Sequence, residues 1–331
     1  MSKSTHFFCY VESLPCCPYA GRNNQLTGRS LVLCISPVVS GTMMENKPSL
    51  LDKSDRDGCI VVVAKCPLPG TSKTRLAPLL GNAGAAALAK AMLSDVLVSL
   101  SQLKVPKILL YAPGTVEGCA HMTAILQELR LFKGWKLIPM EDGDATTGTL
   151  TSSDLGSKLA HALLEARAFS GTGGVVFLGM DSPQVPLDEI EHALYQAAHH
   201  NAALLCPAHD GGYGMLCVPR CASPNVFQGV KWSHPLTAVS QLKALTDAGV
   251  RVVLGRLMYD VDEASDVFLL ANRLVHPTQL PSPTDRLQQS SSGKAERTRE
   301  CDYTWDALVA LGVIVADNEG QHYTININLS R

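Results

Sequence analysis

The sequence has little net charge and no long hydrophobic run, and each absence excludes a class of protein. Its 331 residues include 28 basic and 30 acidic side chains, which gives a formal net charge of −2. A chain this close to neutrality has no general attraction for nucleic acid or for an anionic membrane surface. No run reaches the ~20 apolar residues that a membrane-spanning helix requires. We therefore expect neither a nucleic-acid partner nor a membrane span.

The cysteines lack the spacing of a disulfide framework. There are 11 of them, an odd number, and several lie inside apolar runs. This pattern is typical of buried thiols in a reducing compartment, and it indicates a cytoplasmic protein. Residues 1–57 show no periodicity and predict a disordered tail. Their few acidic residues and many hydroxyl groups leave organelle targeting open as the alternative.

Beyond residue 57, the composition divides the chain into three further segments. Residues 58–275 alternate apolar strand-like runs with helical patterns, which indicates one large α/β domain. Residues 276–300 are rich in Pro, Ser, Gln and charge, and they indicate a linker. Residues 301–331 predict a small α+β appendage, one helix plus a hairpin, that docks on the main domain or on a partner.

The alternation predicts a three-layer α/β sandwich with a mostly parallel sheet. Continuous β-branched runs, such as residues 59–64, are typical of strands buried on both faces. Residues 215–218 follow the preceding strand without a helix between them, so the sheet should be mixed. We expect strands at 59–64, 107–112, 135–140, 175–179, 203–207, 215–218 and 251–259, and helices at 81–103, 121–131, 155–168, 187–199, 235–248 and 263–274.

A stiff basic loop follows the first expected strand. It carries Lys65, Lys73 and Arg75 around prolines and Gly70, which permits backbone conformations closed to other residues. The loop is neither a Walker motif nor a dinucleotide fingerprint, because the glycines that both require are missing. Cations held at a strand end can bind phosphate, with Arg offering a bidentate fork. The alternative is an ordinary basic surface loop.

Two carboxylates follow later strands and suit a hard metal ion. Asp181 comes directly after residues 175–179, and Asp262 lies in an Asp-Val-Asp segment after the last strand. Mg²⁺ usually takes one or two protein carboxylates together with phosphate oxygens and water. Helix capping is the alternative for both, and it explains Glu263 and Asp266 well.

Two further turns carry polar groups that could contact a substrate. Asp210, Gly211, Gly212 and Tyr213 lie between two expected strands, where paired glycines allow close approach to a ligand or a plain hairpin turn. Asp210 could bind a sugar hydroxyl or act as a base, with Tyr213 lining the pocket. Asp154 opens an expected helix, and the choice there is between a cap and a ligand contact.

Taken in order, these motifs resemble the DUF2064 family, also called radical-SAM/selenodomain-associated transferase 1 and often described as an arsenosugar-biosynthesis glycosyltransferase. The resemblance covers residues 59–275. It rests on Lys65–Leu76, Asp154–Gly156, Gly179–Pro183, Pro207–Tyr213, Trp232–Ser233 and Asp260–Asp262. The sequence departs from the family in lacking a Gln shortly before Asp154 and in having Lys158 where Arg is usual.

The resemblance implies a GT-A-like, Rossmannoid nucleotide-diphospho-sugar transferase fold. We expect a glycosyltransferase that uses Mg²⁺ or Mn²⁺, a nucleotide-activated sugar and a small-molecule acceptor. A nucleotidyltransferase that uses a nucleoside triphosphate, and a silent nucleotide-binding scaffold, are the alternatives. The donor's base and sugar, the acceptor and the oligomeric state stay open. The expected site comprises Asp210 and Asp181 in catalysis, Asp181 and Asp262 on the metal, Lys65, Pro69, Gly70, Lys73, Thr74 and Arg75 on the nucleotide, and Asp154, Gly156, Gly211, Gly212, Tyr213 and Trp232 on the substrate.

Overall fold

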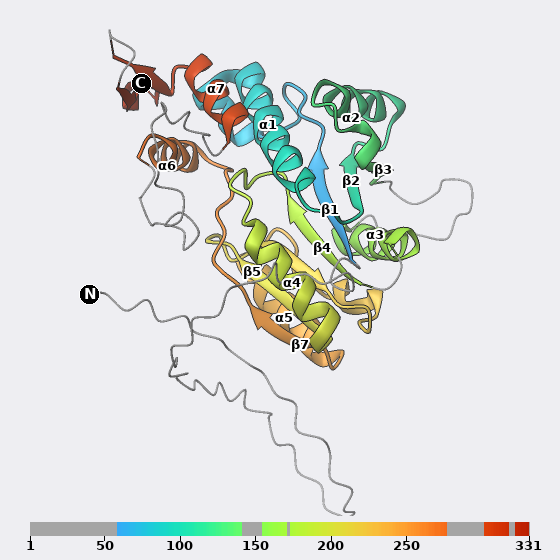
Figure 1. The fold of residues 1–331 in the computed structure, drawn as a ribbon. Coiled ribbons are helices and arrows are strands. Elements are labelled where there is room, and N and C mark those ends of the chain that lie inside the picture. Colours follow the sequence, from blue (N-terminus) through green and yellow to red (C-terminus); the bar gives the residue numbers. More distant parts are fainter. Residues whose placement is uncertain (1–57, 141–153, 171–172, 277–300, 318–321, 331) are drawn as a thin grey trace, which may run out of the picture.

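The computed structural model describes residues 58–140, 154–170, 173–276, 301–317 and 322–330 (Figure 1). The expected N-terminal tail, residues 1–57, and nearly all of the expected linker lie outside these residues. The expected division of the chain into a main domain, a linker and a tail therefore stays a prediction.

A seven-stranded mixed sheet forms the centre of the fold, in the order β3-β2-β1-β4-β6-β5-β7. Every neighbouring pair is parallel except β4–β6 and β5–β6, because β6 runs antiparallel to both of its neighbours. The predicted mostly parallel mixed sheet is confirmed. The strands are β1 (Gly58–Lys65), β2 (Lys107–Ala112), β3 (Lys136–Pro139), β4 (Gly174–Gly179), β5 (Ala202–Pro207), β6 (Tyr213–Val218) and β7 (Arg251–Leu254).

Helices cover both faces of this sheet and make it the middle of three layers. Side chains alternate along β1: Ile60 and Val62 pack under α1 (Ala77–Ser101), α2 (Val116–Glu128) and α4 (Leu187–His200). Cys59 and Val61 face the opposite side, under α3 (Leu155–Ser170) and α5 (Thr237–Asp247). Because apolar groups are needed on both faces, the sequence of β1 is a nearly continuous run of apolar residues. The predicted three-layer sandwich is confirmed.

The first long helical stretch belongs to the core. Residues Thr74–Ser101 are long and apolar enough to cross a membrane by length and composition, but 72% of the apolar window is buried inside the fold. Leu88, Met92, Leu93 and Val96 are fully buried. The apolar character is therefore explained by packing against the sheet and the neighbouring helices.

Several predicted boundaries are wrong by a few residues. The helix α1 begins at Ala77 rather than at residue 81. It has a kink at Gly81 (φ 70°), and the sequence pattern predicted the start of the helix at this glycine. The helix α2 begins at Val116 rather than 121, because the Thr115 side chain accepts a hydrogen bond from the Gly118 N–H (3.1 Å) and caps it. The strand β7 ends at Leu254 rather than 259, because the regular pairing with β5 stops there and only an isolated bridge between Met258 and Ala208 continues it.

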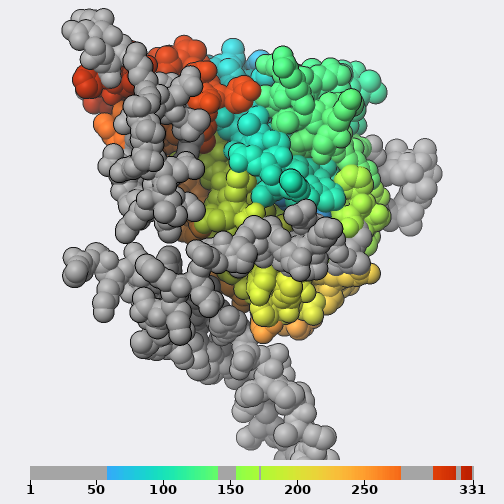
Figure 2. All heavy atoms as spheres, in the orientation of Figure 1, coloured from blue at the N-terminus to red at the C-terminus, as the bar shows by residue number. Residues whose placement is uncertain are grey.

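The C-terminal segment packs on the main domain. Its helix α7 (Asp302–Ala310) contacts α1, and Figure 2 shows these red residues against the blue-green ones. The strands β8 (Ile314–Ala316) and β9 (Tyr323–Ile325) form the expected hairpin. A hydrophobic cluster joins Trp305 and Leu308 to α1 and to α6 (Ala264–Val275), so of the two docking partners expected for this tail the structure shows the domain itself.

Candidate functional site

The candidate site lies where the strand order reverses. From β1 the chain winds outward to β2 and β3 on one side, and β4 pairs with β1 on the other. Ligands of open α/β sheets bind at such a switch point, just beyond the carboxyl ends of the strands. A pocket of about 480 Å³ occupies this position. Its lining includes Lys65 and Ala112, the last residues of β1 and β2, and Asp181, which follows β4. We call it the β1 pocket.

At the floor of the β1 pocket, Lys73 is bound between two carboxylates. Its Nζ lies 2.8 Å from Asp181 Oδ1 and 2.6 Å from Asp262 Oδ1. The lysine side chain is only 8% exposed, whereas the two carboxylates are 34% and 42% exposed. Burial by itself would lower the pKa of Lys73, but the two carboxylates outweigh that effect and hold the pKa above its usual value.

The backbone around this trio is tied together by local hydrogen bonds. The Val261 N–H donates to the Asp181 carbonyl (3.1 Å), which holds the segment before α6 against the turn after β4. Asp266 accepts from the Asp262 and Glu263 N–H groups (3.0 and 2.8 Å). Glu263 is the N-cap of α6 and forms a capping box with Asp266, which confirms the capping interpretation for both.

Neither Asp181 nor Asp262 caps a helix through its side chain. The N-cap position of α4 is Pro186, without a side-chain cap, and that of α6 is Glu263. Both carboxylates instead bind the same ammonium group. The capping alternative therefore does not account for these two residues.

The two carboxylates have the arrangement that a divalent cation needs. Because one atom lies within 2.8 Å of both, they converge on a single point, which the Lys73 ammonium occupies. Within the part of the chain that the structure describes, no group of three or more His, Cys, Asp or Glu could hold a metal. Mg²⁺ often uses only one or two carboxylates and completes its shell with phosphate oxygens and water. The residues present fit such an ion.

The basic loop forms the rim of the β1 pocket. Lys65, Thr71, Thr74 and Arg75 line the pocket together with Lys73. Pro69 and Gly70 are exposed and are not part of the lining. Gly70 adopts φ 74°, and the Leu68 carbonyl accepts hydrogen bonds from Thr71 and Ser72, so the glycine shapes the turn.

Lys73 itself has an uncommon backbone conformation. Its φ and ψ of 50° and 44° lie in the left-handed region, which is disfavoured for residues with a Cβ. Such a conformation persists only where the surroundings over-determine it, and at Lys73 it accompanies the two ion pairs of the side chain. The basic loop therefore presents Lys73 inward, whereas a solvated surface loop would leave it exposed.

A second pocket, of about 640 Å³, adjoins the first and shares Arg75 and Asp262 with it. We call it the β7 pocket, because its lining includes the segment after β7. Tyr259 and His209 stack in its wall with ring centroids 4.4 Å apart, and the Arg273 guanidinium lies 3.3 Å from the Tyr259 centroid. The sequence interpretation missed Tyr259 and Arg273, since no local motif connects a loop tyrosine to an arginine on α6.

Two carboxylates of the β7 pocket belong to motifs singled out in the sequence. Asp210 and Asp260 both line it. Burial, followed by the charge of Asp210, raises the pKa of Asp260 above its usual value. The Gly212 N–H donates to Asp210 Oδ1 (2.7 Å), and this hydrogen bond fixes the Asp210 side chain at the turn. Asp260 was not assigned a role from the sequence, although it belongs to the same Asp-Val-Asp segment as Asp262.

The remaining predicted substrate residues lie outside the lining of both pockets. The Ser157 N–H donates to Asp154 Oδ1 (2.7 Å), which is the capping interaction expected at the start of α3. A Cβ at Gly156 would fall 3.0 Å from Trp232 Nε1, so this glycine allows close packing of α3. Tyr213 and Trp232 pack edge to face, with ring centroids 6.4 Å apart. A substrate-binding role for these residues stays a prediction.

The turn at Gly211 has a structural explanation of its own. Gly211 adopts φ 86°, and a Cβ there would clash with the Pro235 backbone. Its carbonyl accepts a hydrogen bond from the Ala238 N–H (2.9 Å), near the start of α5. The paired glycines thus let the hairpin turn approach α5 closely.

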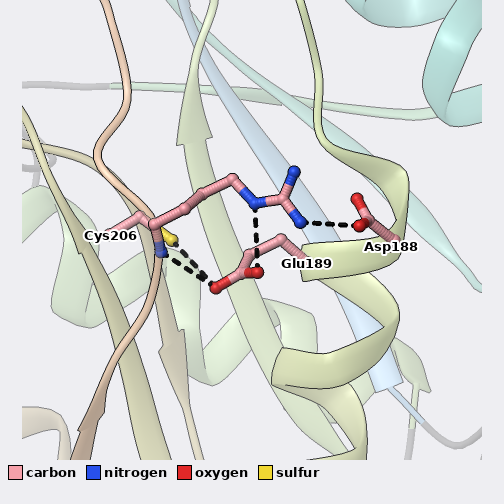
Figure 3. Close-up of polar contacts among 4 residues, drawn as sticks. Asp188, Glu189 and Cys206 are labelled. Atoms are coloured by element: carbon pink, nitrogen blue, oxygen red, sulfur yellow. Dashed lines mark hydrogen bonds and ion pairs between the residues drawn. The ribbon is translucent and has the colours of Figure 1, made fainter. Parts of the chain in front are cut away.

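An arginine clamp, comprising Asp188, Glu189, Cys206 and Arg256, holds the loop that leads to Asp260 and Asp262. Figure 3 shows Asp188 and Glu189, in the first turn of α4, facing the guanidinium group. Glu189 accepts from both the Arg256 backbone N–H (3.1 Å) and Nε (3.2 Å), and Asp188 accepts from the guanidinium Nη2 (2.6 Å). Burial and the Glu189 charge raise the pKa of the Cys206 thiol, which therefore stays protonated.

Comparison with known proteins gives a family match for part of the chain and a similar fold for most of it. Residues 139–234 match the model of DUF2064, described as an uncharacterised protein conserved in bacteria. No curated protein is significantly similar to the chain. Among solved structures, a "putative nucleotide-diphospho-sugar transferase" from Desulfovibrio desulfuricans G20 has 24% identity and a TM-score of 0.60, and the match covers 77% of this chain and 96% of that one.

Two further solved structures are more distant. One is CMP:2-keto-3-deoxy-manno-octonic acid synthetase complexed with CTP, with 13% identity, a TM-score of 0.41 and coverage of 66% of this chain and 100% of that one. The other is 4-diphosphocytidyl-2C-methyl-D-erythritol synthase, with 8% identity, a TM-score of 0.40 and coverage of 65% and 96%. These two superpose too loosely to support an argument about function.

The matched region contains four of the motifs that predicted the family, including Gly179–Pro183 and Pro207–Tyr213. The loop Lys65–Leu76 and the segment Asp260–Asp262 lie outside it, and the structure brings both to the same site. The resemblance to DUF2064 is thereby confirmed for residues 139–234, in a chain with the fold of the D. desulfuricans protein.

Proposed function

We propose that this chain is a metal-dependent glycosyltransferase that binds a nucleotide-activated sugar in the β1 pocket. The observation that carries the proposal is the convergence of Asp181 and Asp262 on Lys73 at the switch point of the sheet. Cations and a pair of converging carboxylates at this position suit a nucleoside diphosphate with a divalent metal ion. The D. desulfuricans protein, which has a similar fold, is named as a nucleotide-diphospho-sugar transferase, and this name agrees with a nucleotide-sugar donor.

In the proposed reaction, Lys65, Lys73 and Arg75 bind the donor phosphates, and Asp181 and Asp262 hold Mg²⁺ or Mn²⁺. When bound, the metal supplies positive charge that stabilises the departing diphosphate. The acceptor oxygen forms a bond to the anomeric carbon. The bond from that carbon to the diphosphate oxygen breaks, and its electron pair leaves with the nucleoside diphosphate.

The acceptor proton needs a base, and Asp210 is our choice. It lies in the β7 pocket, which shares Arg75 and Asp262 with the donor site. Its Oδ1 is already bound by the Gly212 N–H, which orients the carboxylate and leaves Oδ2 to accept the proton. Asp210→Ala should abolish transfer and spare binding of the bare nucleoside diphosphate.

Thermal-shift measurements with nucleoside diphosphates and nucleotide sugars, with and without Mg²⁺, test the donor assignment. A ligand at 100 times its Kd should stabilise the protein by about 2.7 kcal/mol. Asp181→Asn should remove the Mg²⁺-dependent part of this shift, whereas Asp247→Asn, at an exposed position on α5, should not. Equal nucleotide affinity in Asp181→Asn and the parent would contradict the assignment.

Product analysis separates glycosyl transfer from nucleotidyl transfer. Glycosyl transfer releases a nucleoside diphosphate, whereas nucleotidyl transfer from a nucleoside triphosphate releases pyrophosphate. Pyrophosphate release that depends on Asp181 would replace our proposal with the second activity. Metal-dependent nucleotide binding without turnover over a broad acceptor set would instead favour a silent scaffold.

A further inference from the structure

We infer that the β7 pocket binds a neutral acceptor that has hydroxyl groups on one side and an apolar face on the other, and that it rejects phosphorylated acceptors. The inference rests on the proposed function, because it assumes that the donor occupies the β1 pocket. It goes further by naming the chemical class of the acceptor. A sugar ring, or a sugar carrying an apolar aglycone, has this character.

The position of the β7 pocket suits an acceptor. It shares Arg75 and Asp262 with the β1 pocket, so a ligand in it adjoins the phosphate end of a bound donor. Its volume of about 640 Å³ is within the range of pockets that take small molecules. The reacting carbon of the donor would therefore face this second pocket.

One wall of the β7 pocket is apolar and open. Leu257, Tyr259 and Leu269 line it and are 44%, 39% and 44% exposed. Large apolar groups that are exposed together around a hollow mark a binding surface more often than isolated ones do. Arg273 and His209 pack against the Tyr259 ring and hold it in place, so its exposed part contributes a rigid apolar edge to this wall.

The β7 pocket also has polar groups that accept hydrogen bonds, and these are carboxylates. Asp210 and Asp260 line the same pocket, and ionised carboxylates only accept hydrogen bonds. Hydroxyl groups can donate to them. A phosphate offers only negative charge at neutral pH, and like charges placed together in a binding site cost several kcal/mol. The pocket is thus complementary to hydroxyls.

The arginines of the β7 pocket do not offset this repulsion. Arg256 is bound by Asp188 and Glu189. The Arg273 guanidinium lies over the Tyr259 ring, 3.3 Å from its centroid. Arg75 is shared with the β1 pocket, where the donor phosphates would use it. Among the lining residues that the structure describes, each arginine therefore contacts another group or is expected to bind the donor, and none is left to pair with an acceptor phosphate.

Saturation-transfer NMR on the full-length protein tests this inference, with phenyl β-D-glucoside and glucose 6-phosphate as probes and the wild-type chain as reference. Phenyl glucoside should bind, and Tyr259→Ala or Leu269→Ala should weaken it at least about fivefold, as expected for loss of an apolar contact. Val239→Ala, at an exposed residue on α5 outside the pocket, should leave binding unchanged. Glucose 6-phosphate should bind at least about tenfold more weakly than phenyl glucoside. Asp260→Asn should reduce this difference in affinity between the two probes.

The outcomes separate this inference from the proposed function. Tighter binding of glucose 6-phosphate than of phenyl glucoside would overturn the inference, as would phenyl glucoside binding that is insensitive to both apolar variants. Nucleotide binding is read independently through Asp181→Asn. If nucleotide binds and the neutral probe does not, only the acceptor class is wrong, whereas failure of nucleotide binding rejects the donor assignment itself.

Discussion

Lys73 Nζ and Asp262 Oδ1 lie 2.6 Å apart although 189 residues separate them in the chain. The contact joins the basic loop after β1 to the segment before α6, and it buries the lysine side chain. When no metal is bound, an ammonium group in this position offsets part of the negative charge of the two carboxylates. Metal binding to Asp181 and Asp262 would therefore have to compete with Lys73, which would become available to the phosphates.

This competition predicts the behaviour of Lys73→Met. The variant should lose about 1–3 kcal/mol of stability, since it removes hydrogen bonds to two charged groups that are partly exposed to water. Without the competing ammonium group, Mg²⁺ alone should raise its Tm more than it raises that of the wild type. Lys90→Met, which removes an exposed ion pair with Glu128, is the matched control. An identical Mg²⁺ response in all three proteins would speak against a metal at these carboxylates.

Gly255→Ala should disturb the arginine clamp. A Cβ at Gly255 would clash with the Glu189 carboxylate and the Cys206 thiol, so Glu189 could no longer reach the Arg256 N–H. Leaving that buried carboxylate without its partners should cost about 1–3 kcal/mol. Because the clamp holds the loop before Asp260 and Asp262, Mg²⁺-dependent nucleotide binding should weaken as well. Urea unfolding and nucleotide titration measure the two effects, and unchanged values in both would show that the clamp is dispensable.

Gly211→Ala separates a packing role from a substrate role. The substitution should lower stability by about 1–3 kcal/mol, because it combines a left-handed backbone with a clash against Pro235. Gly249→Ala is the control, since Gly249 has a similar φ of 74° with no atom within 4 Å of the added Cβ. We expect the Gly211 variant to unfold at lower temperature than the control. If instead the two variants melt together and only Gly211→Ala loses acceptor binding, a direct substrate role is favoured.

Asp95 gives the attachment of the C-terminal helix a pH dependence. Its carboxylate accepts hydrogen bonds from the Tyr303 and Thr304 N–H groups (3.1 and 2.7 Å) at the start of α7. Burial raises the pKa of Asp95, and the hydrogen bonds from Thr304 and Tyr303 only partly oppose that effect. Because the folded pKa lies above the unfolded one, the folded state binds the proton more tightly. The contribution of Asp95 to stability should therefore increase as the pH falls through the raised pKa towards 3.8.

Asp95→Asn isolates this effect. At pH 7 the amide offers one acceptor oxygen to two N–H donors, so the variant should lose about 1 kcal/mol. The stability difference between wild type and variant should then shift further in favour of the wild type between pH 7 and pH 4, because only the wild type has a carboxyl group to protonate. Chemical denaturation of both proteins at several pH values measures this stability difference. A difference that is constant with pH would show that Asp95 has the same pKa in both states.

The alternation of apolar runs and helical patterns was enough to predict the layers of the fold. Strands such as β1 need apolar groups on both faces, so their consecutive residues are nearly all apolar and can be recognised in the sequence. The order of the strands was not predictable in the same way. β6 forms a local hairpin with β5, but its insertion between β4 and β5 also requires pairing with β4, from which α4 and β5 separate it in the chain. The missing helix before residues 215–218 did signal a mixed sheet.

For the site, the sequence by itself determined which groups stand at strand ends, namely the cations of residues 65–75 and the carboxylates Asp181, Asp210 and Asp262. Local sequence left helix capping and metal binding equally open for Asp181, because a carboxylate before a helix satisfies both patterns. Only the tertiary structure decided that Asp181 and Asp262 meet on Lys73 and that Tyr259, Arg273 and Asp260 share a pocket. The physical reason is that convergence depends on strand order and loop path, which long-range packing sets.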